Sequence, residues 1–284
     1  MLLEIDSLMS GYGKKNVLGG VSLNIGDGEI VAVLGHNGAG KSTLMGTAFG
    51  IIPTSSGRVM FNGADLTRQR ADTRLQAGLG YCPQGAPVFS TMTVEENLLM
   101  GSYAIKADEG WRHRMERALK IFPRLDERRT QRAGSLSGGE RQMLALAMLF
   151  VAGPRLLMLD EPSGGLSPAM VDNTYSAIKE IASQLGAAIM LVEQDVQQAL
   201  RVADRVYVMR AGEVVEKGAT EAVFSTPKHP YTKMLLEAEP TGSKPPPRPG
   251  EPVVLEGRNV EVVFRIGGGF LSGAPVELRA VDRI

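Results

Sequence analysis

The stretch GHNGAGKST, residues 35–43, restricts the fold of this chain more than any other part of the sequence. It matches the phosphate-loop pattern G-x-x-x-x-G-K-[ST] at every fixed position. The strand-like run GEIVAVLG comes directly before it, and the helix-like run KSTLMGTAFG begins inside it. A glycine-rich turn with an incidental lysine is the ordinary alternative. The position between a strand and a helix favours a phosphate-binding loop instead.

The residues of this loop have distinct expected roles. Three glycines let backbone N–H groups close around phosphate oxygens: Gly35, Gly38 and Gly40. The positive end of the following helix faces the same anion. We expect Lys41 to reach the β- and γ-phosphates of a nucleotide and the Ser42 hydroxyl to bind Mg²⁺.

Two acids follow another apolar run in LLMLDEP, residues 156–162. The four apolar residues can fill a buried strand, and burying a carboxylate is costly without a cation or a hydrogen-bond donor. We therefore expect Asp160 to hold Mg²⁺ through water and Glu161 to take a proton from the attacking water. A solvated acidic strand end is the alternative, and the phosphate loop makes it the weaker one.

Strand-like and helix-like stretches alternate along the first 238 residues. LLEIDSL and AAIMLVEQ resemble strands, and RVYVMRAGEVVEKG is expected to form a hairpin that turns at Ala211 and Gly212. Residues 93–150 are expected to be mostly helical. The alternation indicates an α/β domain with a largely parallel central sheet.

Charge, cysteine content and the longest apolar run limit the ligands and the cellular location that we expect for the protein. Lys+Arg and Asp+Glu both number 31, so the formal net charge is zero, whereas nucleic-acid binders usually carry a basic excess. The single cysteine, Cys82, cannot form an internal disulfide. The start MLLEIDSL does not resemble a signal peptide, and the longest apolar run, residues 143–153, is shorter than the ~20 residues that span a bilayer. We expect a cytoplasmic protein that can sit against a membrane through a partner.

The composition changes near the C-terminus. Residues 239–252 contain six prolines and are expected to form a stiff, extended linker. Strand-like sequence resumes at 253–284 and repeats the start of the chain. At a fixed offset of 252 residues, Leu3, Glu4, Leu8 and Tyr12 match Leu255, Glu256, Val260 and Phe264. We interpret residues 253–284 as the opening of a second, truncated copy of the first domain, although two edge strands can resemble each other by chance.

LSGGERQ, residues 136–142, is the most specific string in the sequence. Ser137 and Glu140 are spaced as a capping box for the helix that follows. Gly138 and Gly139 leave the start of that helix bare, so its N–H groups can meet an anion. By itself the pattern is also typical of an ordinary capped helix.

Together, LSGGERQ, GHNGAGKST and LLMLDEP resemble the ATP-binding cassette (ABC) ATPases, and the resemblance covers residues 1–238. It implies a phosphate-loop NTPase fold with a mostly parallel core sheet, an antiparallel β subdomain and a helical subdomain. It also implies ATP and Mg²⁺ as ligands, and hydrolysis of ATP to ADP and phosphate.

The resemblance implies a nucleotide site assembled from several segments. Tyr12 would stack on adenine, and the loop glutamine Gln84 would sense Mg²⁺ and water and contact a membrane subunit. The other phosphate-loop residues would also bind the nucleotide: His36, Asn37, Ala39 and Thr43. In this family two cassettes pack head to tail. Each ATP would then lie between one phosphate loop and the Ser137-Gly138-Gly139 segment of the second cassette.

Two positions depart from the family pattern. The loop SGGLS, residues 163–167, which crosses to the second cassette, usually ends in Asp, whereas this chain has Ser167. Communication between the two sites can be altered by that change. At the switch position, usually His, this chain has Gln194. Glutamine can hydrogen-bond the γ-phosphate but carries no proton at neutral pH, which favours Glu161 as the base.

Two transporter branches share features with the chain. YCPQGAPVFSTMTVEENLLMG and LVEQDVQQAL resemble the ATP-binding subunits of bacterial branched-chain amino-acid importers. KHPYTKMLL, near residue 230, resembles dipeptide and oligopeptide importer subunits, but no cysteine cluster follows it, so we expect no iron–sulfur site. Either branch implies membrane permease subunits, a second ABC domain and, indirectly, a substrate-binding protein as partners. The chain would then lie on the inner face of the cell membrane.

Other classes of function remain as alternatives. A non-transport ABC ATPase acting on nucleic acid or the ribosome would carry long coiled-coil insertions or charged linkers. Residues 85–135 have neither, and the zero net charge also disfavours nucleic acid. A regulatory module without turnover would need a damaged phosphate loop or acid pair, and both are intact.

Overall fold

The computed structural model describes residues 1–103 and 110–237, together with the backbone of two short strands at 262–266 and 276–281. The chain divides into two units, Met1–Glu239 and Pro240–Ile284. The expected proline-rich linker, residues 239–252, lies outside the described residues.

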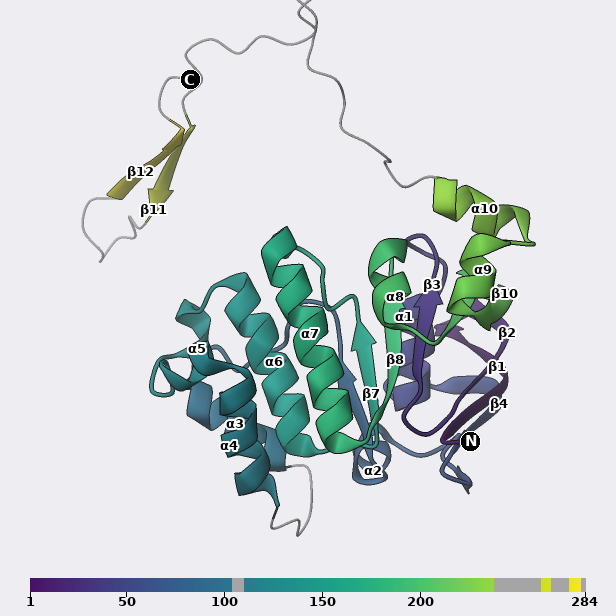
Figure 1. Ribbon diagram of the computed structural model, residues 1–284, viewed down its shortest axis with the longest axis horizontal. Helices are drawn as coiled ribbons and strands as arrows, with labels where there is room; N and C mark the ends of the chain where they lie inside the picture. Colours follow the sequence, from purple (N-terminus) through teal and green to yellow (C-terminus); the bar gives the residue numbers. More distant parts are fainter. Residues whose placement is uncertain (104–109, 238–261, 267–275, 282–284) are drawn as a thin grey trace, which may run out of the picture. The chain divides into compact units, whose positions relative to one another are not determined.

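A six-stranded sheet with the order β10-β9-β3-β8-β7-β6 forms the centre of the first unit (Figure 1). Its strands are β3 (Ile30–Leu34), β6 (Leu79–Cys82), β7 (Leu156–Asp160), β8 (Ala188–Glu193), β9 (Arg205–Arg210) and β10 (Glu213–Ala219). All neighbours are parallel except β10, which pairs antiparallel with β9. Ala211 and Gly212 have φ values of 50° and 83°, as a two-residue hairpin turn requires. The largely parallel sheet and this turn are therefore confirmed.

Strand β7 is buried on both faces. Leu156 and Met158 belong to one buried cluster, and Leu157 and Leu159 belong to another. Because side chains alternate along a strand, a continuous apolar run is what a central strand with two covered faces needs. The run ends at Asp160, where the strand reaches the edge of the core.

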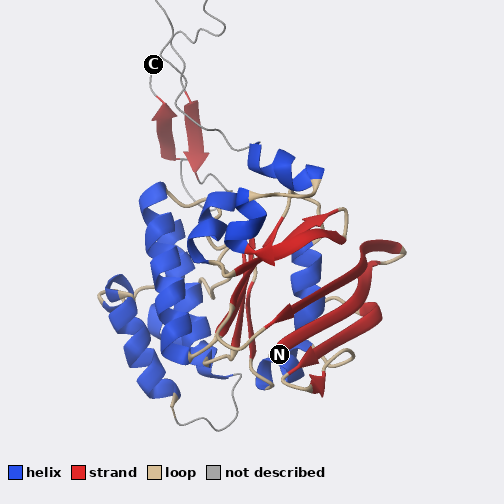
Figure 2. Cartoon of the chain, turned by 45° about the vertical axis from the view of Figure 1, so that its right-hand side comes forward, coloured by secondary structure: helices blue, strands red, loops and turns tan. Residues whose placement is uncertain are grey.

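A second, antiparallel sheet has the order β2-β1-β4-β5 (Figure 2). It consists of β1 (Leu3–Tyr12), β2 (Lys15–Ile25), β4 (Thr54–Phe61) and β5 (Ala64–Asp65). The helix α1 (Lys41–Phe49) packs its apolar side chains against both sheets. Leu44 lies in the same buried cluster as Leu3 of β1 and Val31 of β3. The start of α1 is thereby fixed between the two sheets.

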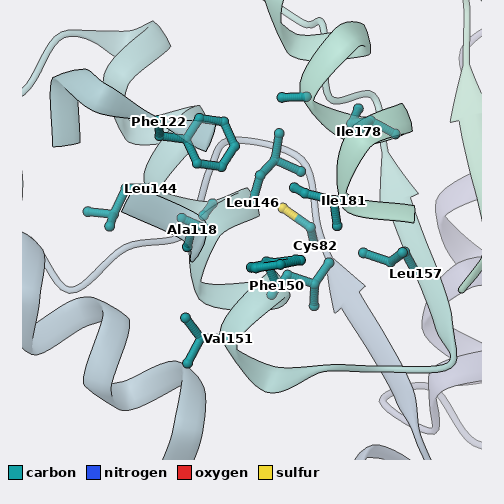
Figure 3. Packing of buried hydrophobic residues seen from close by; sticks show 14 of the residues in the cluster. Cys82, Ala118, Phe122, Leu144, Leu146, Phe150, Val151, Leu157, Ile178 and Ile181 are labelled. Atoms are coloured by element: carbon teal, nitrogen blue, oxygen red, sulfur yellow. The ribbon is translucent and has the colours of Figure 1, made fainter. Parts of the chain in front are cut away.

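The opposite face of the central sheet is covered by helices, which Figures 1 and 2 show gathered on one side. The helical part comprises α3 (Val94–Tyr103), α4 (Trp111–Ile121), α5 (Pro123–Asp126), the 3₁₀ turn η1 (Ala133–Ser135), α6 (Gly138–Ala152) and α7 (Pro168–Leu185), with the short α2 (Ala71–Gln76) preceding β6. Figure 3 shows Phe122, Phe150 and Ile178 packed with Cys82 and Leu157 in one cluster. The predicted antiparallel and helical portions are both present.

Three short helices cover the remaining part of the central sheet: α8 (Val196–Val202), α9 (Thr220–Ser225) and α10 (Pro230–Glu237). Tyr231 and Leu235 of α10 belong to the same buried cluster as Leu34 of β3 and Val208 of β9. The segment around KHPYT is therefore part of the core of the first unit.

In the second unit, β11 (Val262–Ile266) and β12 (Val276–Val281) form an antiparallel pair. Both fall inside residues 253–284, where the sequence predicts strands. Across the described portion of the chain, the helices are too short or too polar to cross a membrane.

Candidate active site

The phosphate loop connects β3 to α1 and is shaped by its glycines. A Cβ atom on Gly35 would lie 2.3 Å from the carbonyl oxygen of Met209, so only glycine fits there. Gly40 is the residue just before α1 and has a φ of 101°, a conformation that favours glycine. The first N–H groups of α1 have no partner within the helix and can bind an anion.

The Lys41 side chain is buried inside this loop. Its Nζ donates to the carbonyl oxygens of Gly35 (2.7 Å) and His36 (3.3 Å) and lies 3.9 Å from Glu161 Oε1. Burial lowers the pKa of Lys41, while the nearby carboxylates of Glu161 and Asp160 act in the opposite direction. Burial in a low-dielectric environment disfavours the charged ammonium, and an anionic ligand bound beside it would stabilise that charge.

Asp160 is buried at the end of β7, beside Ser42 of the loop. Ser42 acts to lower the pKa of the Asp160 carboxyl, and Tyr81 OH donates to Asp160 Oδ2 at 3.5 Å. Burial raises the pKa of the Asp160 carboxyl, and its Oδ1 has no hydrogen-bond partner within the described part of the chain. A hydroxyl and an incompletely satisfied carboxylate are hard oxygen donors of the kind that bind Mg²⁺, so these residues fit that ion.

Glu161 is held by two side-chain amides. Gln84 Nε2 donates to its Oε2 at 2.9 Å, and Gln194 Nε2 donates to its Oε1 at 2.6 Å. The backbone N–H of Glu161 bonds to the carbonyl oxygen of Val192 at 2.9 Å. Its φ of 48° is unusual for a residue other than glycine.

These contacts follow from the order of the strands. β6, β7 and β8 are parallel neighbours, and Gln84, Glu161 and Gln194 each follow the end of one of them. The ends of parallel strands meet at one edge of a sheet, which is where ligands bind in open α/β folds. The structure thus brings together three residues that the sequence places far apart.

A second buried carboxylate, Glu193, supports this arrangement and was not predicted as a site residue. Its Oε1 accepts hydrogen bonds from Ser163 Oγ (2.9 Å) and from Tyr175 OH, and its Oε2 accepts from the backbone N–H of Gln194 at 3.2 Å. Burial raises its pKa despite these donors. Ser163 lies two residues after Glu161, and Gln194 donates to Glu161. The hydrogen bonds of Glu193 therefore connect the segment that carries Glu161 to the segment that carries Gln194. The available signal was an acid at the end of the apolar run AIMLVE, which has to find donors if it is buried.

The phosphate loop opens into a cleft of about 750 Å³. Predicted residues that line it are Tyr12, Asn37, Gly38, Gly40, Lys41, Ser42, Thr43, Gln84, Glu161 and Gln194. Lys15, Asn16, Val17 and Ala211 also line it and were not predicted. Tyr12 is 59% exposed, and its hydroxyl accepts a 3.5 Å hydrogen bond from Thr43 Oγ1. The exposed side chain is available for stacking on a base.

The LSGGERQ segment lies elsewhere. Ser137 caps α6: its Oγ accepts from Glu140 N (3.3 Å), and Glu140 Oε2 accepts from Ser137 N (2.9 Å), which confirms the predicted capping box. Ser137 lines a different pocket, together with Phe122 and Met170, and not the cleft of the phosphate loop. A Cβ atom on Gly138 would meet nothing within 4 Å in the described structure, so this helix start is open.

Comparison with known protein families agrees with this geometry. The model of the family described as "ABC transporter" matches residues 18–164, more than half of the chain. The chain belongs to the ABC transporter ATP-binding proteins. A second model, described as "Oligopeptide/dipeptide transporter, C-terminal region", matches residues 215–257 of this ABC protein.

Individual relatives of this ABC protein cover different lengths. It is 40% identical over 227 residues to the high-affinity branched-chain amino acid transport ATP-binding protein BraG of Pseudomonas aeruginosa, covering 80% of this chain and 97% of BraG. It is 31% identical over 278 residues to the peptidoglycan transport ATP-binding protein YejF of Agrobacterium fabrum, covering 93% of this chain and 51% of YejF. A solved structure titled "Structure of ATP binding subunit of ABC transporter" superposes with a TM-score of 0.71 at 29% identity, covering 84% of this chain and 95% of that one.

The ABC ATPase fold and the family predicted from the three motifs are therefore confirmed. ABC transporter ATP-binding proteins bind ATP and hydrolyse it in a reaction coupled to transport, so this chain is an ATPase of that kind.

Proposed function

We propose that this ABC ATPase powers an importer for branched-chain amino acids. The similarity to BraG over nearly the whole length of that protein supports this substrate class. The match of residues 215–257 to a peptide-transporter C-terminal region supports peptide import less strongly, because it covers only a short segment. A non-transport role on nucleic acid or the ribosome is not favoured, because the relatives are named for transport.

An uptake assay separates the two substrate classes. Cells carrying Glu161→Gln in place of the wild-type chain are expected to lose uptake of labelled leucine and to retain uptake of a labelled dipeptide. Loss of dipeptide uptake with unchanged leucine uptake would contradict the proposed substrate class and leave the ATPase assignment intact.

The observation that carries the proposed mechanism is the Glu161 carboxylate, held by Gln84 and Gln194 at 2.9 and 2.6 Å and facing Lys41 at 3.9 Å. Ser42, Asp160 and Gln84 would hold Mg²⁺, which neutralises phosphate charge when bound. Tyr12 stacks on adenine, and the backbone of residues 35–43 surrounds the phosphates.

During hydrolysis the side chains act on the γ-phosphate and the attacking water. Lys41 leaves its loop carbonyls and pairs with the β- and γ-phosphates. Gln194 donates to the γ-phosphate as a neutral group. Glu161 accepts the proton of the water that attacks phosphorus, as a general base does.

We assign Ser137, Gly138 and Gly139 to the site of a second ABC domain. Their separation from the cleft of their own chain and the open helix start at Gly138 support a head-to-tail pair. Glu161→Gln protein is expected to dimerise in Mg-ATP, measured by light scattering, because it binds ATP without consuming it. Glu161→Gln protein that also carries Ser137→Arg should stay monomeric. Equal dimerisation of both proteins would contradict this role.

The permease is proposed to contact an apolar cleft of about 210 Å³ next to the Gln84 loop. Tyr81, Cys82, Pro87, Met100, Gly101, Ala145, Met148 and Leu149 are among its lining residues. Cys82 and Pro87 flank Gln84 in sequence, so a permease segment seated there would touch the loop that contacts Glu161. A substrate-binding protein would act through the permease, and the chain would lie at the cytoplasmic face of the membrane.

Co-purification tests this contact. Met148→Glu should abolish co-purification of the permease while leaving Mg-ATP affinity unchanged. Met234→Glu is the control for adding a charge at a methionine away from this cleft, because Met234 is exposed on α10. Permease binding that survives Met148→Glu would contradict the assignment.

We also propose that residues 1–238 form an autonomous ABC domain, that 239–252 are a linker, and that 253–284 begin a second ABC domain. The match of Leu3, Glu4, Leu8 and Tyr12 to Leu255, Glu256, Val260 and Phe264 supports the repeat. Deleting residues 240–284 should leave Mg-ATP affinity and melting temperature nearly unchanged. A large loss of either would mean that the tail is an integral part of the first domain.

A further inference from the structure

Tyr231, in the KHPYT segment, connects the C-terminal part of the first unit to the phosphate loop. Its ring is buried in the cluster that contains Leu34 and Leu235. Its hydroxyl points out of this cluster and accepts a 3.0 Å hydrogen bond from the backbone N–H of His36. The two rings also meet edge to face, with centroids 5.7 Å apart.

His36 is fixed from its other side by the phosphate loop itself. Its carbonyl oxygen accepts from Lys41 Nζ (3.3 Å) and from the backbone N–H of Ala39 (3.1 Å). One peptide segment therefore lies between the Tyr231 hydroxyl and the lysine that is expected to bind phosphate. A shift of this segment would move the carbonyl that Lys41 contacts.

The position of Tyr231 is itself well supported. Glu216 of β10 accepts hydrogen bonds from the backbone N–H groups of Lys228 (2.8 Å) and His229 (3.0 Å). His229 Nδ1 accepts from the backbone N–H of Tyr231 at 3.1 Å. The Arg210 guanidinium lies over the Tyr231 ring, 5.3 Å from its centroid. The start of α10 is thus anchored to the central sheet and can serve as a fixed support for the loop.

We infer that Tyr231 is a positioning residue of the nucleotide site: its hydroxyl holds the His36 peptide so that the phosphate loop is preformed before ATP arrives. This inference rests on the proposed role of residues 35–43 in binding phosphate. A loop held in its binding shape loses less conformational freedom when the ligand binds, so the contact contributes to affinity. The simpler explanation is that Tyr231 only fills the core, and that role needs the ring without the hydroxyl.

Tyr231→Phe separates the two roles because it keeps the ring. Tyr207→Phe is the matched control: Tyr207 is also buried, and its hydroxyl accepts from the backbone N–H of Asn24 (3.1 Å), at the end of β2. Each variant removes one hydroxyl from a buried tyrosine, but only Tyr231 contacts the phosphate loop.

For the full chain, we expect Tyr231→Phe to weaken Mg-ATP binding about three- to tenfold by calorimetry, the size of one hydrogen bond. In the assembled transporter, KM for ATP should rise by a similar factor while kcat stays within twofold. Hydrogen exchange of residues 35–39 should become faster. Tyr207→Phe should lower the melting temperature by a few degrees and change none of these three quantities.

Unchanged affinity and unchanged exchange in Tyr231→Phe would overturn the inference, as would an equal loss of affinity in Tyr207→Phe. Either result leaves the proposed function standing. Failure of the wild-type chain to bind Mg-ATP would instead contradict the role of the phosphate loop itself.

Discussion

The Gln194 amide donates a 2.6 Å hydrogen bond to Oε1 of Glu161, the carboxylate proposed as the base. Gln84 contacts the other oxygen of the same group at 2.9 Å. Both donors are neutral, so they orient the carboxylate without adding a charge beside it. A glutamine at the switch position is consistent with this arrangement, because an amide can contact both the base and the γ-phosphate.

Removing this donor should affect turnover more than binding. Gln194→Ala is expected to lower kcat about 10- to 100-fold, because a misplaced catalytic group costs that much. Mg-ATP affinity should change less than threefold, since Lys41 and the loop N–H groups remain. Steady-state kinetics of the assembled transporter, together with calorimetry, measure the two effects. A variant that loses affinity and keeps kcat would contradict the placement of Gln194.

Glu193 should matter for both stability and turnover. Glu193→Gln replaces one acceptor oxygen by an NH₂ group, so one of three buried donors loses its partner at a cost of about 1–3 kcal/mol. We expect a melting temperature several degrees lower and a reduced kcat at temperatures far below the transition. Glu180→Gln, an exposed change on α7, is the control and should alter neither quantity. A Glu193→Gln protein with wild-type melting and turnover would show that this network is dispensable.

We expect Lys41 to contribute to nucleotide binding and to lower the stability of the nucleotide-free protein. Lys41→Met removes a buried ammonium whose pKa is lowered by burial, so the charged form is disfavoured in the fold. We expect the melting temperature without nucleotide to be equal or higher, and Mg-ATP affinity to fall roughly 10- to 100-fold with the loss of charged hydrogen bonds. Calorimetry and thermal melts measure the two changes. Unchanged affinity would mean that residues 35–43 are not the phosphate site.

The pair of Glu29 and Arg205 should make stability depend on pH. Although burial raises the pKa of Glu29, hydrogen bonds from Arg205 (2.6 and 3.0 Å) and from the backbone N–H of Gly26 (2.7 Å) lower it overall. A carboxyl whose pKa falls on folding stabilises the protein above its unfolded value of about 4.3, and this stability is lost as pH falls through the folded pKa. Glu29→Gln should therefore destabilise the protein by roughly 1–3 kcal/mol at pH 7, and this effect should shrink as pH falls below the unfolded pKa and vanish once pH is below the folded pKa.

Denaturant unfolding at several pH values tests this sign. Asp27→Asn is the control, because Asp27 forms a 3.0 Å ion pair with Arg155 at an exposed position, where such pairs contribute little. A Glu29→Gln effect that does not shrink between pH 7 and the lowest pH at which the protein stays folded would contradict the assignment.

The sequence predicts those parts of the fold and of the site that depend only on residues close together in the sequence. The phosphate loop, the strand ending at Asp160, the turn at Ala211 and the capping box of Ser137 each follow from a short local pattern. Which loops meet depends on the order of strands in the sheet, and that order is set by packing of the whole domain.

The family resemblance implies that distant segments share one nucleotide site, but it does not predict the particular contacts between them. The hydrogen bonds of Glu161 to Gln84 and Gln194 require β6, β7 and β8 to be neighbours. The bond between Tyr231 and His36 joins positions 195 residues apart. Glu193 could have been noticed as an acid in an apolar strand, but its three donors come from segments with no common pattern.

The central claim is that Glu161 is the base of an ATPase site built on residues 35–43, and Glu161→Gln tests it most directly. Mg-ATP affinity and the rate of ATP hydrolysis are measured on the same preparation of the assembled transporter. Affinity should stay within a few-fold of wild type, because the phosphate loop is intact. The hydrolysis rate should fall roughly 10²–10⁴-fold, the range for a positioned general base. Hydrolysis at a near wild-type rate would contradict the account.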